Sequence, residues 1–228
     1  MFQKMMDGGK LMTERNISRG TSITDSNGGV IKYSNDQFFK FKRATLPAGA
    51  VDGINEYLSQ QDLKWEDARY GGNLETDDNT RKSKIAWVTD DGLKSYIYSQ
   101  FDSANSDPDW QFELDAMEDI QYTKYEGHPD NQFNGHYDWH YDYLMAPEEP
   151  RKCRKLSMTL MLNQHGDEYE GGSFEFQCLK NGSIGYQKLD LNAGDILVFP
   201  SLMHHRVNFV THGERRVLVA WVWGPLFK

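Results

Sequence analysis

The C-terminal half of the chain is divided into short segments of strand length, and glycine-containing turns separate several of them. An apolar run covers residues 156–162, and a turn at residues 193–195 precedes a second run at residues 196–199. Both runs have the length of buried strands rather than of helices. Further strand-like segments lie near residues 110–114, 120–125, 171–176 and 216–223. Many short strands joined by glycine turns are typical of a β-sandwich or a double-sheet roll.

Two helices are predicted before these strands. The first covers residues 48–60 and follows Pro47, and the second ends near Asn105. Apolar residues recur at helical spacing in both, at Val51, Ile54 and Leu58 and at Leu93, Ile97, Phe101 and Ala104. Residues 65–83 are interpreted as a polar loop, and residues 1–30 as an irregular N-terminal arm rich in Gly, Ser, Thr and Asn.

Composition disfavours several classes of protein. Hydrophobic residues make up 38% and charged residues 26% of the 228 residues, which is the balance of a folded domain rather than a disordered chain. The formal net charge of −9 disfavours nonspecific binding to nucleic acid. The dense basic cluster at residues 151–155 is interpreted as a solvated loop.

The cysteines and the apolar runs bear on location. Cys153 and Cys178 fit two reduced thiols rather than a disulfide framework. No apolar run reaches membrane-spanning length, and the N-terminus lacks the apolar stretch of a signal peptide. We therefore expect a cytoplasmic protein with no membrane partner.

Two distant segments combine the residue types of a metal site. His140 and Asp142 are two residues apart, so on a strand both side chains point to one face. With the distant His205 they offer two imidazoles and one carboxylate, a set that suits non-haem Fe(II) and leaves positions open for a cosubstrate and O₂. Arg215 could then bind a distal carboxylate of the cosubstrate with two parallel hydrogen bonds.

Alternatives remain open at this point. His-x-Asp is also common on exposed strands, His136-x-Asp138 is a rival pair, and His204 competes with His205. A structural zinc site is disfavoured because no thiol is suitably placed. Ligand type alone does not exclude copper, nickel or manganese.

At these residues the chain resembles the 2-oxoglutarate- and Fe(II)-dependent oxygenases, specifically their prolyl 4-hydroxylase-like branch. The resemblance extends from about residue 120 to the C-terminus, and a looser upstream element lies at residues 81–87. Its pieces follow the family's order, at residues 125–127, 137–142, 154–157, 169–172, 194–195, 199–201, 205–207, 210–215 and 219–221. It implies a mainly β fold with a double-stranded β-helix (jelly-roll) core, and two or more helices packed on one face. Residues 31–228 would form one oxygenase domain, with a catalytic core at about 120–228.

The resemblance also orders the candidates for the site. The family places a Tyr three residues before the metal His, which favours Tyr137 with His140; the competing frame would pair Phe133 with His136. Its His-x-Val pattern selects His205 over His204.

The family's roles can then be carried over to matching residues. His140, Asp142 and His205 are the implied iron ligands, and with Arg215 they form the implied catalytic set. Arg215 and Tyr125 would bind 2-oxoglutarate. The candidates for substrate contact are Arg154, Tyr137 and Trp221, although Trp221 equally fits plain core packing and Arg154 the solvated loop. Met161 stands where some relatives carry a Tyr.

The implied reaction is hydroxylation with O₂ and 2-oxoglutarate, releasing succinate and CO₂, with ascorbate as a candidate additional cofactor. A peptide or protein is the expected substrate, and peptidyl proline the expected target. Asp142 favours hydroxylation, because a related halogenating site lacks the carboxylate. Another amino acid, a small molecule or a nucleic-acid alkyl group are alternative substrates. A non-catalytic jelly-roll binding module is a remote alternative, which would have no need of His205 or Arg215. The loops at 65–83 and 126–136 would be either a peptide-gripping lid or plain solvent-exposed loops.

Overall fold

The computed structural model describes most of the chain between residues 22 and 227. Backbone and side chains are described at residues 41–47, 49–69, 77–106, 110–128, 134–146, 149, 151–178 and 184–227, and backbone alone at 22–24, 30–32, 179–180 and 183. Most of the expected arm at residues 1–30, and Phe133 of the competing frame, lie outside these ranges.

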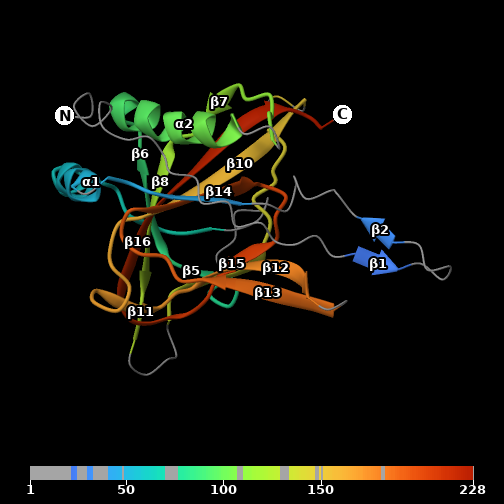
Figure 1. The fold of residues 1–228 in the computed structure, drawn as a ribbon. Coiled ribbons are helices and arrows are strands. Elements are labelled where there is room, and N and C mark those ends of the chain that lie inside the picture. The colour runs from blue at the N-terminus through green and yellow to red at the C-terminus, as the bar shows by residue number, and fades with distance from the viewer. Residues whose placement is uncertain are drawn as a thin grey trace.

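Within the described ranges, a nine-stranded antiparallel sheet is the larger of two that face each other (Figure 1). Its strands are β3 Lys42–Thr45, β4 Glu66–Asp67, β6 Lys84–Val88, β7 Ala116–Met117, β8 Ile120–Glu126, β10 Lys152–Met161, β11 Tyr169–Gly171, β14 Asp195–Pro200 and β16 Val210–Pro225. Their order across the sheet is β3-β14-β10-β16-β8-β6-β4, and β7 and β11 also pair with β16.

The smaller sheet has five strands in the described part of the chain. They are β5 Arg81–Lys82, β9 His136–His140, β12 Phe174–Lys180, β13 Ser183–Leu189 and β15 His205–Val207. Their order is β13-β12-β15-β9-β5. Separately, β1 Ser22–Thr24 pairs with β2 Val30–Lys32.

The helices α1 Ala50–Ser59 and α2 Asp91–Asn105 cover the outer face of the larger sheet. Figure 1 shows both helices on one side of this sheet and the smaller sheet on the other. Asp90 caps α2, where its carboxylate accepts a hydrogen bond from the Leu93 amide at 2.7 Å. The first helix begins and ends close to its predicted positions, and the second ends at Asn105 as predicted. The predicted mainly β architecture, with two helices on one face, is confirmed.

Alternation along β16 separates the two faces of the larger sheet, because successive side chains on a strand point to opposite faces. The residues that pack beneath the helices are Leu218, Ala220 and Val222. The residues that face the smaller sheet are Arg215, Val217, Val219 and Trp221. The inner face of this strand therefore carries the buried Arg215, whereas the residues packed beneath the helices are apolar.

The predicted strand at residues 110–114 is wrong. The Asn105 side chain bonds both backbone groups of Phe112, and Gln111 adopts a positive φ of 45°, so the segment cannot join a sheet. Trp110 and Phe112 nevertheless pack against the helix-side core, which explains their alternation.

The loop predicted at residues 65–83 contains two short strands, β4 and β5, near its ends, and residues 70–76 lie outside the described ranges. The solvated loop predicted at residues 151–155 is also wrong. Residues 152–155 begin β10, and Lys155 is buried with its ammonium 3.5 Å from the Phe227 ring centroid. Both cysteines are free, as predicted. No helix in the described ranges is long and apolar enough to cross a membrane.

Candidate metal centre

His140 and His205 lie on neighbouring strands of the smaller sheet, and Asp142 lies just beyond the end of one of them. His140 ends β9, Asp142 follows two residues later, and His205 begins β15. The antiparallel pairing places His205 opposite His140. One potential ligand atom from each residue lies within 4.8 Å of the others. Sheet pairing thus brings the two distant segments together.

Backbone carbonyls orient both imidazoles. Nδ1 of His140 lies 2.6 Å from the Asp138 carbonyl oxygen, and Nδ1 of His205 lies 2.8 Å from that of Met203. A carbonyl can only accept a hydrogen bond, so each Nδ1 carries a proton and each Nε2 of the neutral ring presents a lone pair. The Nε2 atoms lie 3.7 Å and 3.4 Å from the two carboxylate oxygens of Asp142.

The electrostatics of this arrangement favour a bound cation. Burial, followed by the neighbouring His205, lowers the pKa of His140 to about 3, so its ring is neutral near pH 7. Burial opposes ionisation of Asp142, but the adjacent imidazoles, Arg154 and a hydrogen bond from Ser157 outweigh it and lower its pKa. Neutral imidazoles and an ionised carboxylate are the forms in which these residues bind a divalent metal.

Arg215 is buried beside these residues without a partner. It is 1% exposed, and none of its guanidinium nitrogens has a hydrogen-bond partner in the described part of the chain. It pairs across β16 and β8 with Tyr125, whose ring centroid lies 5.4 Å from its Cζ. The neighbouring Tyr169 hydroxyl lies close enough to interact with Arg215, and it donates a hydrogen bond to the Leu191 carbonyl at 3.3 Å. Among the described residues no carboxylate pairs with the guanidinium. An unpaired buried charge is costly, so the guanidinium fits an anionic ligand.

Gly172 leaves the space that Arg215 occupies. A Cβ at this position would lie 2.8 Å from Arg215 Cδ and 2.9 Å from Val210 Cγ2, and the backbone has a φ of +63°. Both observations favour glycine. The Gly171-Gly172 pair belongs to the resemblance, but its role in accommodating Arg215 needed the structure.

One cavity joins the proposed metal ligands to Arg215. Its other lining residues include Tyr125, Thr159, Phe199, Val217 and Trp221. Carboxylate and guanidinium therefore face a shared space between the sheets, with apolar walls between them. The structure thus brings together the residues predicted for metal and cosubstrate, while their binding roles remain predictions.

Tyr137 supports His140 in this structure. The two rings stack with centroids 3.5 Å apart and an interplanar angle of 12°. Arg81 lies over the Tyr137 ring, with Cζ 4.5 Å from its centroid, and donates to Gln121 Oε1 at 2.8 Å. Burial raises the pKa of Tyr137 to about 12, so its phenol is neutral. Tyr137 also lines the cavity, and its predicted contact with substrate remains a prediction.

Arg154 is already paired. Its Nε and Nη2 donate to the two carboxylate oxygens of Glu118 at 2.5 Å and 2.6 Å, and its Cζ lies 4.1 Å from the Trp221 ring centroid. Trp221 in turn lines the cavity, with its buried indole N–H unpartnered among the described residues. A substrate that reaches Arg154 would meet an ion pair with no net charge. To bind Arg154 directly, it would have to replace or share the hydrogen bonds that Glu118 accepts. Glu118 was missed by the sequence analysis, and its position before β8 gave no separate signal.

The alternative candidates His136, Asp138 and His204 lie apart from the cluster of His140, Asp142 and His205. Both ring nitrogens of His136 lie 3.0 Å from backbone carbonyls, those of Asn134 and Asn79. Asp138 is half exposed and lies 4.0 Å from Arg206. His204 lies on the outer side of the sheet, where its Nδ1 is 2.8 Å from Gln177 Oε1. None of the three joins the cluster.

Comparisons with known proteins agree with this geometry. The family model described as the 2OG-Fe(II) oxygenase superfamily matches residues 120–223. A PKHD-type hydroxylase of Psychrobacter sp. (strain PRwf-1) is 38% identical over 89 residues, which cover 38% of this chain and 32% of that protein. A PKHD-type hydroxylase of Prochlorococcus marinus (strain MIT 9301) is 30% identical over 175 residues, 72% of this chain and 67% of that protein. The match to the first relative thus spans only about a third of its length.

A similar solved structure is a prolyl hydroxylase from Trichoplax adhaerens in complex with a hypoxia inducible factor oxygen degradation domain peptide fragment. It shares 17% sequence identity with a TM-score of 0.61, and the likeness covers 82% of this chain and 86% of that one. This likeness confirms the predicted jelly-roll fold. The chain therefore belongs to the 2-oxoglutarate- and Fe(II)-dependent oxygenase superfamily and has the fold of its prolyl 4-hydroxylase-like branch.

Proposed function

We propose that the protein is a 2-oxoglutarate- and O₂-dependent Fe(II) hydroxylase that releases succinate and CO₂. One observation carries this proposal. Two imidazole lone pairs and a buried carboxylate converge in the same cavity as a buried, unpartnered guanidinium. A ferrous ion and a dicarboxylate would satisfy both groups at once.

The residues present fit the cofactors that the superfamily uses. His140, Asp142 and His205 would hold the metal on one face, and Arg215 would bind the distal carboxylate of 2-oxoglutarate beside Tyr125. Iron with 2-oxoglutarate and O₂ supplies the oxidising power for hydroxylation of an unactivated C–H bond.

The protein's own contribution is orientation and exclusion of water. The carbonyls of Asp138 and Met203 fix the two imidazoles, so the ligand set is organised before metal binds. Apolar residues such as Phe199 and Val217 wall the cavity and strengthen the electrostatic interactions within it. Asp142 occupies a position that halide would need in a halogenating site, so hydroxylation is the supported reaction.

Peptidyl proline is the proposed target. The fold likeness to a prolyl hydroxylase crystallised with a peptide supports a peptide substrate. The Glu118–Arg154 pair and the indole of Trp221 give this part of the site a neutral, partly aromatic character, which suits an uncharged residue within a chain. The unpartnered indole N–H of Trp221 could donate to a substrate carbonyl.

The first experiment measures succinate formation by the purified protein with Fe(II), 2-oxoglutarate and ascorbate, the last as a proposed supporting reductant. The wild type should form succinate, even uncoupled from substrate, whereas His205→Ala should not. His212→Ala is the matched control, because His212 is exposed and outside the site. Full activity in His205→Ala would refute the ligand assignment.

The second experiment identifies the substrate class. A panel of proline-rich peptides, other peptides, free amino acids and alkylated nucleic acid is incubated with the active protein. Mass spectrometry then reports any product that has gained one oxygen atom. Oxygen gained on proline supports the proposed target, and gain confined to another class would replace it. The two free cysteines fit a reducing, cytoplasmic location, which we include in the proposal.

A further inference from the structure

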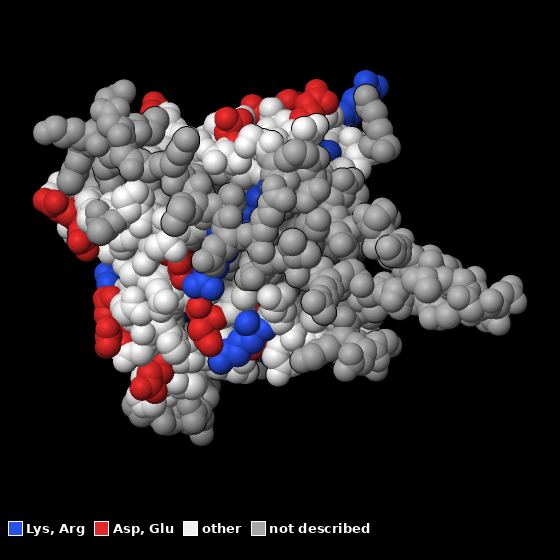
Figure 2. Space-filling view, viewed as in Figure 1, with Lys and Arg blue, Asp and Glu red and all other residues white. Residues whose placement is uncertain are grey.

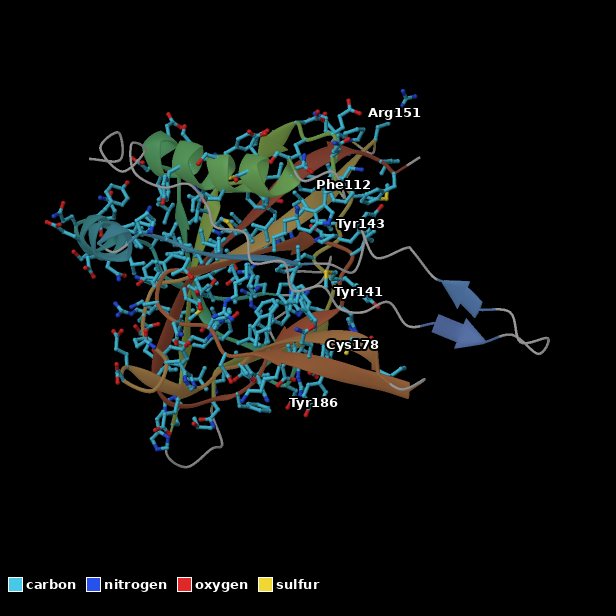
Figure 3. All side chains as sticks on the ribbon, viewed as in Figure 1. Phe112, Tyr141, Tyr143, Arg151, Cys178 and Tyr186 are labelled. Atoms are coloured by element: carbon cyan, nitrogen blue, oxygen red, sulfur yellow. The ribbon has the colours of Figure 1, made fainter. Side chains whose placement is uncertain are left out.

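The residues that flank the proposed metal ligands form a cluster on the opposite face of the smaller sheet. Trp139 and Tyr141 flank His140, and His204 precedes His205. Trp139 precedes His140 on β9, and neighbouring strand residues point to opposite faces. Tyr141 follows the end of β9 and His204 precedes the start of β15, and their ring contacts place them beside Trp139. Figure 3 shows Tyr141 and Cys178 of β12 at the same end of this smaller sheet.

The three outer rings pack against one another. The His204 ring lies 4.4 Å from that of Tyr141 at an interplanar angle of 21°, and 5.3 Å from that of Trp139 at 33°. Both distances are centroid separations typical of favourable aromatic pairs. His204, which immediately precedes β15, therefore contacts both neighbours of His140.

Hydrogen bonds fix the imidazole of His204 in this position. Its Nδ1 lies 2.8 Å from Gln177 Oε1 on β12, and the ring also bonds the backbone of Trp139. The Gln177 amide donates to the His204 carbonyl at 2.9 Å. Arg206 extends the cluster, with Cζ 4.7 Å over the Trp139 ring and Nη2 2.7 Å from the buried Glu175.

The backbone pairing of β9 with β15, which joins the two ligand-bearing segments, is short and irregular. β15 has only three residues, and its pairing with β9 is limited to His205 with His140 and Val207 with Tyr137. The register shifts between these two pairs. Metal ligands need closely fixed relative positions, and cross-strand side-chain contacts are what usually stabilise such a pairing.

We propose that His204 is a positioning residue. Its contacts with Trp139, Tyr141 and Gln177, on the side of the smaller sheet away from the cavity, hold the two ligand-bearing segments together. This inference rests on the proposed metal site. It predicts that loss of the His204 ring weakens metal binding although the ring contacts neither metal nor substrate.

The test is calorimetric titration of the full metal-free chain with Co(II), under anaerobic conditions and with 2-oxoglutarate present. His204→Ala should weaken Co(II) binding about tenfold, the lower end of the range for residues that orient metal ligands. His204→Phe keeps the ring stack and should recover most of the affinity. His212→Ala, on the exposed part of β16, should bind Co(II) as the wild type does.

A merely structural role gives a different result. His204→Ala would then lower the unfolding midpoint of the metal-free protein while Co(II) affinity stayed unchanged, and this outcome overturns the inference. If His204→Ala does not fold, Tyr141→Ala tests the same stack, because Tyr141 is 58% exposed and tolerates truncation. Weaker Co(II) binding in Tyr141→Ala supports the inference, and unchanged binding overturns it.

Failure of the metal site itself is distinguishable. If the wild type does not bind Co(II), or His205→Ala binds it as tightly, the proposed function and this inference both fall. If His205→Ala loses binding but His204→Ala keeps it, only the role of His204 is refuted.

Discussion

The two faces of the larger sheet contain opposite kinds of residue. The face beneath the helices is a continuous apolar core, in which Phe101 of α2 and Leu160 of β10 are fully buried. The inner face, toward the smaller sheet, buries Arg215, Thr159 and Gln121 among its apolar residues. Both faces are largely buried, yet the groups that could bind ligands line the inner face.

This difference indicates that the two faces of the sheet have separate roles, one in stability and the other in ligand binding. Burial of apolar surface on the helix side supplies stability. Unpaired or mutually repelling polar groups on the inner side cost stability until ligands satisfy them. Figure 2 shows charged side chains of both signs among the described residues of the visible face. The predictions below test this separation of roles, starting with the largest expected effect.

Removal of His205 should abolish function without unfolding the protein. His205→Ala removes one of three proposed ligands, so Co(II) affinity should fall by about a hundredfold or more and succinate formation should cease. The metal-free protein should still fold, because the apolar core beneath the helices is intact, although ring contacts of His205 with Phe174 and Phe199 are lost. A loss of fold together with metal binding would show that the two faces are not separable.

Truncation on the helix side should have the converse result. Phe101→Ala removes a fully buried ring of α2 and should lower the free energy of unfolding by about 3–5 kcal/mol. Denaturant unfolding measures this loss. The folded fraction should still bind Co(II) with wild-type affinity; a large loss of affinity would contradict this separation of roles.

A change of geometry at constant charge should weaken cosubstrate binding. Arg215→Lys keeps the cation but removes the planar fork that binds a carboxylate through two hydrogen bonds, which should cost about 2 kcal/mol, or roughly thirtyfold in 2-oxoglutarate affinity. Arg216→Lys is the matched control, because Arg216 points outward and pairs with Glu168. Equal 2-oxoglutarate affinities in calorimetric titration of the two variants would refute the role of Arg215.

The last prediction is a pH dependence of the stability of the metal-free protein, in which His140 acts only gradually across several pH units. Burial first, and then His205, lowers the pKa of His140 from 6.5 to about 3. Below pH 6.5 the unfolded chain takes up a proton that the folded protein does not, so stability falls as pH decreases toward 3. The slope from this group is at most about 1.4 kcal/mol per pH unit. Urea unfolding of wild type and His140→Gln between about pH 4 and about pH 8 should give a difference that narrows or reverses toward acid pH; a constant difference would contradict the assigned shift.

The sequence predicted the parts of the molecule that follow local patterns. Both helices follow their apolar periodicity, and β14 follows its glycine turn. The segment at residues 110–114 failed because a side chain, Asn105, replaced the strand partners of Phe112. The three residues of β15 were too short for any periodicity to reveal.

The ligand residues of the site could be predicted from the sequence, but the side chains that contact and orient the site residues could not. The resemblance selected His140, Asp142, His205 and Arg215, which the structure places around one cavity. It did not indicate that Glu118 pairs with Arg154, since this contact joins segments 36 positions apart. Long-range side-chain contacts of this kind depend on sheet register, which local patterns do not determine.

The central claim is that His140, Asp142 and His205 hold one metal while Arg215 binds the cosubstrate beside it. A crystal structure of the protein with Mn(II) and 2-oxoglutarate, grown without O₂, tests this most directly through anomalous scattering. We expect a single strong anomalous peak between the two Nε2 atoms and the Asp142 carboxylate, with the distal carboxylate of 2-oxoglutarate bound to Arg215. A peak elsewhere, no peak, or a dicarboxylate bound away from Arg215 would contradict the account.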